Sequence, residues 1–440
     1  MLEPASYTAF LRAVHSSPQG SLAMGITKSP FVIGLTGPVG SGVTTLSHAL
    51  ADNGFIRASV SDPIKEELRK QEGRENEFEF DEKHMPDFRK KMQDIGNAGR
   101  AKDPHHWIQR AVEGKDESKP LVVDGIRNLK EIEYLREKFS PRFFLVAVHA
   151  SPDVRWRREQ DAYDKNLKNF ERDDLRDGDE ESPSGQQVTK CVQQADYVFV
   201  NDGSDGSTQA QKTKLFGRIR ADIHLMQEAG DAPQKVIRRP VKPDEVHMAT
   251  AYAQAHMSQC LKRVVGALIV GTDNLPLSLG YNENPVGMLP CINLYAGCFK
   301  DDDMHAKLEA MSGSKCPSCG ESQHTLVEPW ICTNPSCRKD LKAVFFPSRN
   351  MELCTAIHAE ERAIRSLHGR SAEGGTIFTT TFPCFQCSRY IVDARIKRVV
   401  YVEAYPVKEA KNFLIKNDIK VDPFEGFKAR AFNLIFRQVG

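Results

Sequence analysis

Near the C-terminal end of the chain, one histidine and two cysteines stand at the spacing of a metal site. The sequence reads H-A-E from His358 to Glu360, and P-C-F-Q-C around Cys384 and Cys387. One imidazole and two thiolates leave the fourth tetrahedral position of a zinc ion open for water, as a catalytic site requires. The ion would lower the pKa of that water and supply hydroxide near neutral pH. The pattern therefore predicts a catalytic zinc site at His358, Cys384 and Cys387.

Glu360 supplies the acid that such a site needs. It lies two residues after His358, so its carboxylate can point into the site without being a metal ligand. In the expected reaction Glu360 takes the water proton and delivers it to N3 of a cytosine ring. The hydroxide attacks C4, and Glu360 then protonates the leaving ammonia. The joint pattern H-x-E and P-C-x-x-C is the signature of zinc deaminases, whereas either half alone would mean little.

A second group of cysteines precedes this motif. Cys316, Cys319, Cys332 and Cys337 have the C-x2-C-x12-C-x4-C spacing of a zinc ribbon. Four thiolates close the coordination sphere, so we expect a structural zinc ion here. The alternative is a ribbon that contacts nucleic acid.

A glycine-rich segment near the N-terminus follows an apolar run and opens a helical pattern. Backbone N–H groups of such a turn cradle phosphate, and the helix N-terminus adds to the field. Val43 stands where a P-loop normally has lysine, and this loss should weaken phosphoryl transfer. Asp124, at the end of a later apolar run, is expected to act through Mg²⁺ in the Walker B manner. The predicted nucleotide-binding residues are Gly37, Gly40, Ser41, Gly42, Thr44, Thr45 and Asp124.

The elements that position these residues can be read from apolar runs. In the first half, short buried strands are expected at residues 31–35, 121–123, 143–148 and 197–200. Helical patterns separate them, which predicts an α/β fold with a parallel sheet and helices on both faces. Residues 157–187, rich in charge, Gly and Ser, are read equally well as a lid or as a solvated loop.

In the second half, the expected strands are residues 264–270, 376–380 and 398–402, with helices beginning near His358 and Cys384. Helix N-termini would favour the thiolate form of the zinc-binding cysteines. The proline-containing stretch before residue 243 marks a boundary. The expected organisation is a lead-in (1–30), a P-loop kinase-like domain (31–227), a linker (228–243) and a deaminase-like α/β/α domain (244–440) with the ribbon inserted at about 285–350.

The bulk composition narrows the class of partner. Among 440 residues, 60 are basic and 59 acidic, for a formal net charge of +1. This balance gives no general drive toward nucleic acid or an anionic membrane. The longest apolar run, 143–148, is too short to span a bilayer, and the N-terminus lacks the pattern of a secretory signal. A cytoplasmic location is therefore expected, and in such a reducing compartment the C-x-x-C pairs read as metal ligands rather than disulfides.

From Asp244 onward the chain resembles the deoxycytidylate deaminases. The matching stretches are "KRVVGALIVG", "LGYNENPVG", "HAEERAI", "TIFTTTFPCFQCSRYIV" and "RVVYVEAYP". In that family the asparagine of "GYN" contacts the nucleotide, which implies a substrate-binding role for Asn282. The family usually has Gly next, whereas Glu283 stands here. Arg263 and Tyr405 are weaker candidates for the substrate pocket.

Residues 31–205 resemble nucleoside and deoxynucleoside monophosphate kinases. The matching pieces are the P-loop, "SDPIKEELRK", "VVDGIRN" and the cluster Arg155, Arg157 and Arg158. A kinase-like domain in front of a deoxycytidylate deaminase resembles the bacterial antiphage deoxycytidine nucleotide deaminases. That resemblance implies conversion of dCTP or dCMP to the uracil nucleotide, a homo-oligomer, and a P-loop domain that binds a regulatory nucleotide.

Two other functions remain open. One is a polynucleotide cytosine deaminase that docks RNA or DNA through the ribbon, although the neutral charge makes nucleic acid an unexpected substrate. The other is a non-catalytic, nucleotide-sensing scaffold, against which the intact Glu360 speaks. The preference between dCTP and dCMP, the activating signal and the oligomer size are not encoded in any motif.

Overall fold

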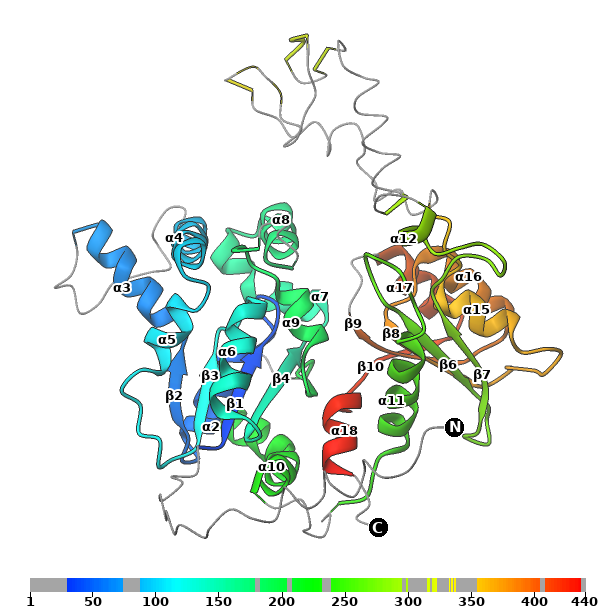
Figure 1. Ribbon diagram of the computed structural model, residues 1–440, viewed down its shortest axis with the longest axis horizontal. Coiled ribbons are helices and arrows are strands. Elements are labelled where there is room, and N and C mark those ends of the chain that lie inside the picture. Colours follow the sequence, from blue (N-terminus) through cyan, green and yellow to red (C-terminus); the bar gives the residue numbers. More distant parts are fainter. Residues whose placement is uncertain are drawn as a thin grey trace, which may run out of the picture.

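The chain folds into two α/β domains that lie side by side (Figure 1). Each domain is built on its own β-sheet. In this computed structural model the described residues are 30–73, 88–178, 183–203, 208–231, 239–294, 298–299, 354–403 and 408–436, with short pieces around the ribbon cysteines (315–316, 319–322, 332, 334 and 336–337).

The first sheet has the strand order β11-β5-β4-β1-β3-β2. Strands β1 to β5 are parallel, as the alternation of strands and helices predicted, and β11 joins the edge antiparallel to β5. The strands are β1 (Val32–Thr36), β2 (Ile56–Ser59), β3 (Leu121–Asp124), β4 (Phe143–His149), β5 (Tyr197–Val200) and β11 (Gly426–Phe427).

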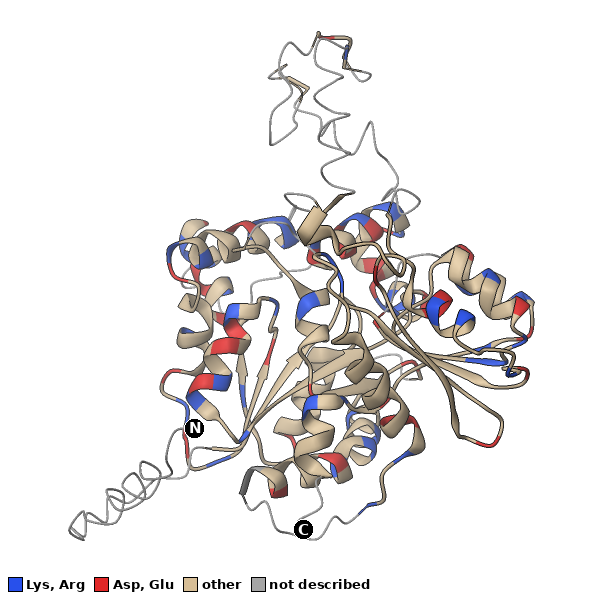
Figure 2. Ribbon diagram, turned by 45° about the vertical axis from the view of Figure 1, so that its right-hand side comes forward, with Lys and Arg blue, Asp and Glu red and all other residues tan. Residues whose placement is uncertain are grey.

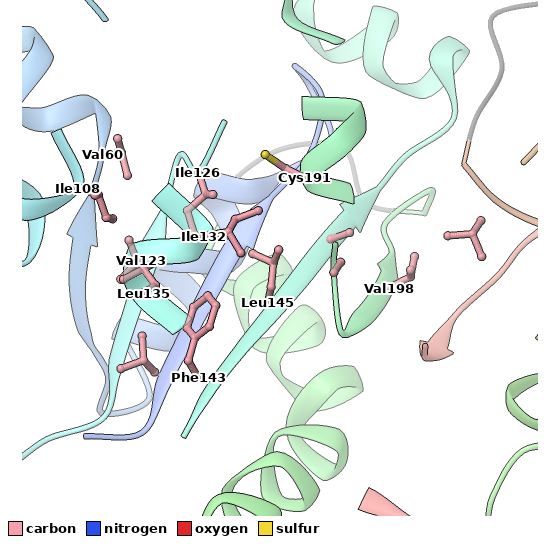
Figure 3. Close-up of a cluster of buried hydrophobic side chains, with 14 of the residues drawn as sticks. Val60, Ile108, Val123, Ile126, Ile132, Leu135, Phe143, Leu145, Cys191 and Val198 are labelled. Atoms are coloured by element: carbon pink, nitrogen blue, oxygen red, sulfur yellow. The ribbon is translucent and has the colours of Figure 1, made fainter. Parts of the chain in front are cut away.

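Successive residues of the central strands face opposite layers of helices, which is why these runs are apolar throughout. Val123 and Leu145 pack with α6 (Leu129–Phe139) on one face, and Figure 3 shows them in one cluster with Ile132 and Leu135 of that helix. Val122 and Phe144 belong to the cluster on the other face. The remaining helices of this domain are α2 (Val43–Ala51), α3 (Ser61–Gln71), α4 (Phe88–Lys102), α5 (His106–Val112), α7 (Pro152–Glu159), α8 (Leu167–Gly178), α9 (Val188–Gln193) and α10 (Gln209–Asp231), with the 3-10 helix η2 (Gln160–Tyr163).

The second sheet has the order β10-β9-β8-β6-β7. Strand β6 is antiparallel to both of its neighbours, and β8, β9 and β10 are parallel. Its elements are α11 (Pro243–Ala255), β6 (Gly266–Val270), β7 (Pro276–Tyr281), α12 (Cys291–Leu294), α15 (Ala359–Arg365), β8 (Thr376–Thr381), α16 (Phe385–Asp393), β9 (Arg398–Glu403), α17 (Lys408–Lys416), β10 (Lys420–Pro423) and α18 (Ala429–Ile435).

Two glycines let helices approach this sheet closely. A Cβ at Gly266 would lie 1.9 Å from the Ala251 carbonyl oxygen in α11, and one at Gly280 would lie 2.1 Å from the Ala359 carbonyl oxygen in α15. Ala251 packs with Leu268 on one face of the sheet, whereas Ala359 belongs to the cluster on the other face. The predicted α/β/α layering of the second domain is therefore confirmed.

The C-terminal end of the chain returns to the first domain. After β10 it adds β11 to the first sheet, where the Phe427 ring packs edge-on against Tyr197 at a centroid distance of 4.9 Å. Helix α18, drawn red, then lies between α10 and α11 (Figure 1). The two domains thus share a continuous interior.

Several expectations differ from the structure in detail. The stretch 157–187, read as a lid or a solvated loop, is largely helical, because α7, η2 and α8 lie within or across it. Strands β2, β7, β10 and β11 carry no strand prediction. Nearly all of the expected lead-in, residues 232–238 of the expected linker and most of the insertion lie outside the described residues. The described part of the linker is partly helical, because α10 extends to Asp231 and α11 begins at Pro243. The domain boundaries stay predictions.

Charge is distributed without a single dominant sign on the face shown in Figure 2, where blue and red residues interleave along the helices. This fits the near-zero net charge. Among the described helices, none combines the length and the apolarity that crossing a membrane demands.

Candidate active site

The predicted zinc ligands come together at two helix N-termini. His358 is the N-cap of α15, and Cys384 is the N-cap of α16. The Sγ atoms of Cys384 and Cys387 lie 3.4 and 3.3 Å from Nδ1 of His358. These separations suit ligands that share one tetrahedral zinc ion at bond lengths of about 2.0–2.3 Å. One imidazole, two thiol groups and this geometry therefore fit Zn²⁺.

Cys384 has the electrostatic surroundings of a thiolate. Its hydrogen bond with Cys387 and then that with His358 lower its pKa to about 4. The hydrogen bond to Cys384 also raises the pKa of His358 to about 9. The site thus favours a negative sulfur beside a positive partner, and a metal cation can take the place of that partner's proton.

Glu360 is held inside the site by the first turn of α15. Its side chain is only 4% exposed, and its Oε2 lies 3.7 Å from Sγ of Cys387. Burial raises the pKa of Glu360 to about 7. A carboxyl group that titrates near neutral pH can both accept and return a proton, which is what general acid–base catalysis asks of it.

Asn282 lies beside this motif, but its amide is already engaged within the protein. Its Oδ1 accepts a hydrogen bond from the backbone N–H of Val265 at 2.7 Å, and its Nδ2 donates to the carbonyl of Arg263 at 2.8 Å. The backbone of the next residue, Glu283, pairs with Ile357, directly before His358. The structure thus brings the asparagine loop against the zinc motif, and its contact with substrate remains a prediction.

Arg362, which the sequence did not single out, fastens this loop. Its guanidinium donates to the carbonyls of Tyr281, Glu283 and Asn284 at 2.9–3.0 Å. The only sequence signal was its place in "HAEERAI", one turn after the zinc histidine. Tyr405, the third pocket candidate, lies outside the described residues.

The four ribbon cysteines also gather into one cluster. The Sγ atoms of Cys316 and Cys337 are 4.0 Å apart, and those of Cys319 and Cys332 are 3.6 Å apart. All four sulfur atoms lie within 4.8 Å of one another. A left-handed Gly320, with φ 76°, lets its N–H donate to the Cys316 carbonyl at 2.8 Å in a tight turn. The cluster fits a closed zinc ribbon with four cysteine ligands.

The glycine-rich loop opens onto a cavity of about 1480 Å³ in the first domain. Gly40 and Gly42 have φ of 77° and 96°, which glycine adopts without strain. Ser41 instead points inward, 1% exposed, and does not line the cavity. The predicted nucleotide-binding residues that do line it are Gly37, Gly40, Gly42, Thr44, Thr45 and Asp124.

Positive charge reaches the loop from α7 rather than from the loop itself. Arg158 donates to the Gly40 carbonyl at 2.9 Å, and Arg155 donates to the Val39 carbonyl at 3.1 Å. Asp124 is ion-paired with Arg57 at 2.8 Å and is almost fully buried. A role for Asp124 in holding Mg²⁺ therefore stays a prediction.

Comparisons with known proteins match two separate parts of the chain. Residues 241–403 match the family model described as the cytidine and deoxycytidylate deaminase zinc-binding region, and residues 33–177 match an AAA domain model. The deoxycytidylate deaminase of Saccharomyces cerevisiae is 25% identical over 50% of this chain and 55% of its own length. The chain thus spans little more than half of that relative.

The first half has relatives of its own. A UPF0200 protein of Sulfurisphaera tokodaii is 25% identical over 43% of this chain and 97% of its own length.

Among solved structures, the dCMP deaminase of the cyanophage S-TIM5 aligns with 42% of this chain and all of its own, with 22% identity and a TM-score of 0.26. By the family models, residues 33–177 are similar to AAA domains and residues 241–403 to the zinc-binding region of cytidine and deoxycytidylate deaminases.

Proposed function

We propose that the protein catalyses zinc-dependent hydrolytic deamination of a deoxycytidine nucleotide, dCMP or dCTP, to the deoxyuridine nucleotide. The observation that carries this proposal is a buried Glu360 beside the triad His358, Cys384 and Cys387. The relatives of this half that are named deoxycytidylate deaminase support the choice of substrate class.

In the proposed reaction, Zn²⁺ held by the triad supplies Lewis acidity that lowers the pKa of water. Glu360 accepts a proton from that water and delivers it to N3 of the cytosine ring. Oxygen adds at C4, Glu360 takes the remaining proton of that oxygen and passes it to the amino group, and the C4–N bond breaks to release ammonia. A carboxyl pKa of about 7 suits both directions of transfer.

A polynucleotide substrate, reached through the ribbon, is the second candidate. The balanced charge of the chain argues against it, because nucleic-acid binding draws most of its affinity from phosphate contacts. Incubating the protein with dCMP, dCTP and a cytosine-containing oligonucleotide, and measuring uracil in each, separates the candidates. Uracil in the oligonucleotide alone would refute the free-nucleotide proposal.

We further propose that the reaction depletes dCTP in the cytoplasm during phage infection. Support comes from the resemblance to antiphage deaminases and from thiol groups suited to a reducing compartment. Mass spectrometry of nucleotides from infected cells should show dCTP and dCMP falling with the wild type and not with Glu360→Ala. If Glu360→Ala kept both ammonia release and protection, the protein would be a scaffold and not an enzyme.

The P-loop domain is proposed to bind a regulatory nucleotide. The cavity beside Gly42 and Thr44 and the arginines at its rim support binding, and Val43 in place of lysine speaks against efficient phosphoryl transfer. Gly42→Ala should abolish nucleotide binding, because its Cβ would lie 2.3 Å from Nδ2 of Asn201. Gly54→Ala is the matched control, with φ 94° and nothing within 4 Å. Full regulation in Gly42→Ala and Thr44→Ala would refute the proposal.

A further inference from the structure

A run of contacts leads from the glycine-rich loop toward the zinc site. It begins at Asn201, which follows β5. The Nδ2 of Asn201 donates to the Ser41 carbonyl at 2.9 Å, and its backbone N–H donates to the His149 carbonyl at 2.7 Å. His149 is the last residue of β4. Asn201 therefore connects the glycine-rich loop to the end of the central strand β4.

The loop and Asn201 are packed too closely to move independently. A Cβ at Gly42 would lie only 2.3 Å from Nδ2 of Asn201. Arg158 bridges the same two segments, donating to the Gly40 carbonyl at 2.9 Å and to the Asn201 carbonyl at 2.6 Å. Between Gly40 and Gly42, a bound phosphate would accept hydrogen bonds from backbone N–H groups. A change in the orientation of these peptides must therefore shift Asn201.

From His149 the contacts cross into the second domain through aromatic rings. The imidazole packs edge-on against Tyr401 of β9, with centroids 5.9 Å apart and planes at 78°. Tyr401 packs edge-on against Phe382 at 4.8 Å and 86°. All three side chains are at most 9% exposed. Burial lowers the pKa of His149 to about 4, so the ring is neutral at pH 7 and meets Tyr401 as a packed aromatic group.

Phe382 stands two residues before the zinc ligand Cys384. Its backbone N–H donates to the Glu403 carbonyl at 2.8 Å. The carboxylate of Glu403 in turn accepts hydrogen bonds from Thr381 at 3.2 Å and from Gln193 of α9 at 3.0 Å. In Figure 1, β9 lies beside the helices of the first domain. The segment that enters the zinc site is therefore held by the first domain at two places.

We infer that His149 and Tyr401 couple the glycine-rich loop to the zinc site, so that a change in the loop changes the position of the segment from Phe382 to Cys384. This inference rests on the proposed function, since it assumes deamination at the zinc site and a nucleotide at the loop. The rings transmit the change because a close-packed interior shifts between discrete arrangements. A ligand that alters the loop thereby alters the site that carries Cys384.

The test measures how a loop ligand changes dCMP deamination by the full-length protein. The probes are nucleoside triphosphates without a cytosine base and inorganic triphosphate. In the wild type, the probe that binds should change kcat/KM by a factor in the range of about 5–150. His149→Ala should keep the basal kcat/KM within about twofold but reduce the response to less than about twofold. His149→Phe, which keeps a ring against Tyr401, should restore most of it.

His247→Ala is the matched control. His247 is another buried histidine, whose ring packs against Phe378 at a centroid distance of 5.1 Å with the planes tilted by 48°, but it lies in α11 and outside the ring path. It should keep the full response. Tyr401→Leu repeats the test from the other domain and serves if His149→Ala does not fold. A full response in either path variant, or its loss in His247→Ala, overturns the inference and leaves the proposed function standing. A wild type that deaminates dCMP but ignores every probe refutes the proposed regulation itself.

Discussion

At the scale of single residues, burial sets the pKa of the proposed proton carrier. Glu360 sits on the first turn of a short helix, 4% exposed, and loss of solvent brings its pKa to about 7. Its neighbours His358 and Cys387 belong to the metal triad, whereas its own carboxylate is not among the clustered ligand atoms. In the proposed reaction, metal binding and proton transfer thus belong to different side chains.

This separation predicts the behaviour of Glu360→Gln. The variant removes the proton carrier and keeps the ligands, so kcat for dCMP should fall by about 10²–10⁴-fold. The zinc content, measured by atomic emission, should stay at the wild-type level. A variant that lost its metal would show that Glu360 helps to hold the ion. Asp393→Asn, on the last turn of α16, is a control that should leave kcat unchanged.

Residue patterns predicted the zinc site because its spacing is local. His358 and Glu360 lie in one turn and Cys384 and Cys387 in another, so short-range sequence fixes both halves. Arg362 had no such signal. Its role depends on three carbonyls about 80 residues away, which only the folded sheet brings to it.

At the scale of elements, the ribbon cysteines form a separate candidate metal site within the second half. Its four cysteines form their own cluster and share no ligand with the triad. A closed site of four thiolates has no open position for water and hence no catalytic use.

The wild-type protein should therefore carry two zinc ions per chain, and Cys332→Ser with Cys337→Ser should carry one. Deamination of dCMP by this double variant should stay within a few-fold of the wild type, because the triad is intact. Metal analysis and kinetics on the same sample provide the check. Loss of both ions would show that the two sites fold together.

Lys428, at the N-cap of α18, binds this helix to the first domain. Its Nζ donates to the carbonyls of Val192 and Gln193 at 3.0 and 2.7 Å. Burial lowers its pKa to about 8 from 10.5. The charged form is thus disfavoured in the folded protein relative to the unfolded chain.

The unfolded chain consequently binds more protons at Lys428 than the folded protein between pH 8 and 10.5, so stability gains as the pH rises through this window. From pH 8 to 9.5 the wild type should gain about 2 kcal/mol relative to Lys428→Met. Urea unfolding at both pH values measures the difference. Lys416→Met, on an exposed lysine, should show no such pH dependence.

At the scale of the whole molecule, Arg239 joins the two domains. Its guanidinium binds Asp222 of α10 at 2.8 Å and Glu245 of α11 at 2.7 Å. Glu245 is fully buried and also accepts the backbone N–H of Phe427 at 3.0 Å. The sequence predicted a domain boundary near this arginine but gave no reason to expect an ion pair across it.

Arg239→Met should destabilise the protein by about 3–5 kcal/mol, because it leaves two buried carboxylates without their cation. Since these carboxylates lie on different domains, calorimetry should resolve two melting transitions where the wild type shows one. Arg395→Met removes the exposed pair with Glu373 and should cost at most about 1 kcal/mol. A single unshifted transition in Arg239→Met would contradict the bridging role.

Strand β11 was not predicted from the sequence, and the reason is physical. It is two residues long, Gly426–Phe427, and has no alternating pattern of its own. Its position depends on β5, more than 200 residues earlier. A sequence can indicate a domain that is built from one continuous segment. It does not indicate that a much later segment adds a strand to that domain.

That return also determines when the first domain can be completed during synthesis. During synthesis the ribosome releases the first domain long before Phe427 leaves the exit tunnel, so the β5 edge and its Tyr197 ring emerge without their final partner. An open strand edge invites pairing with other chains. A nascent chain stalled before residue 426 should therefore depend on chaperones, and the P-loop half reaches its finished form only after Phe427 has left the tunnel.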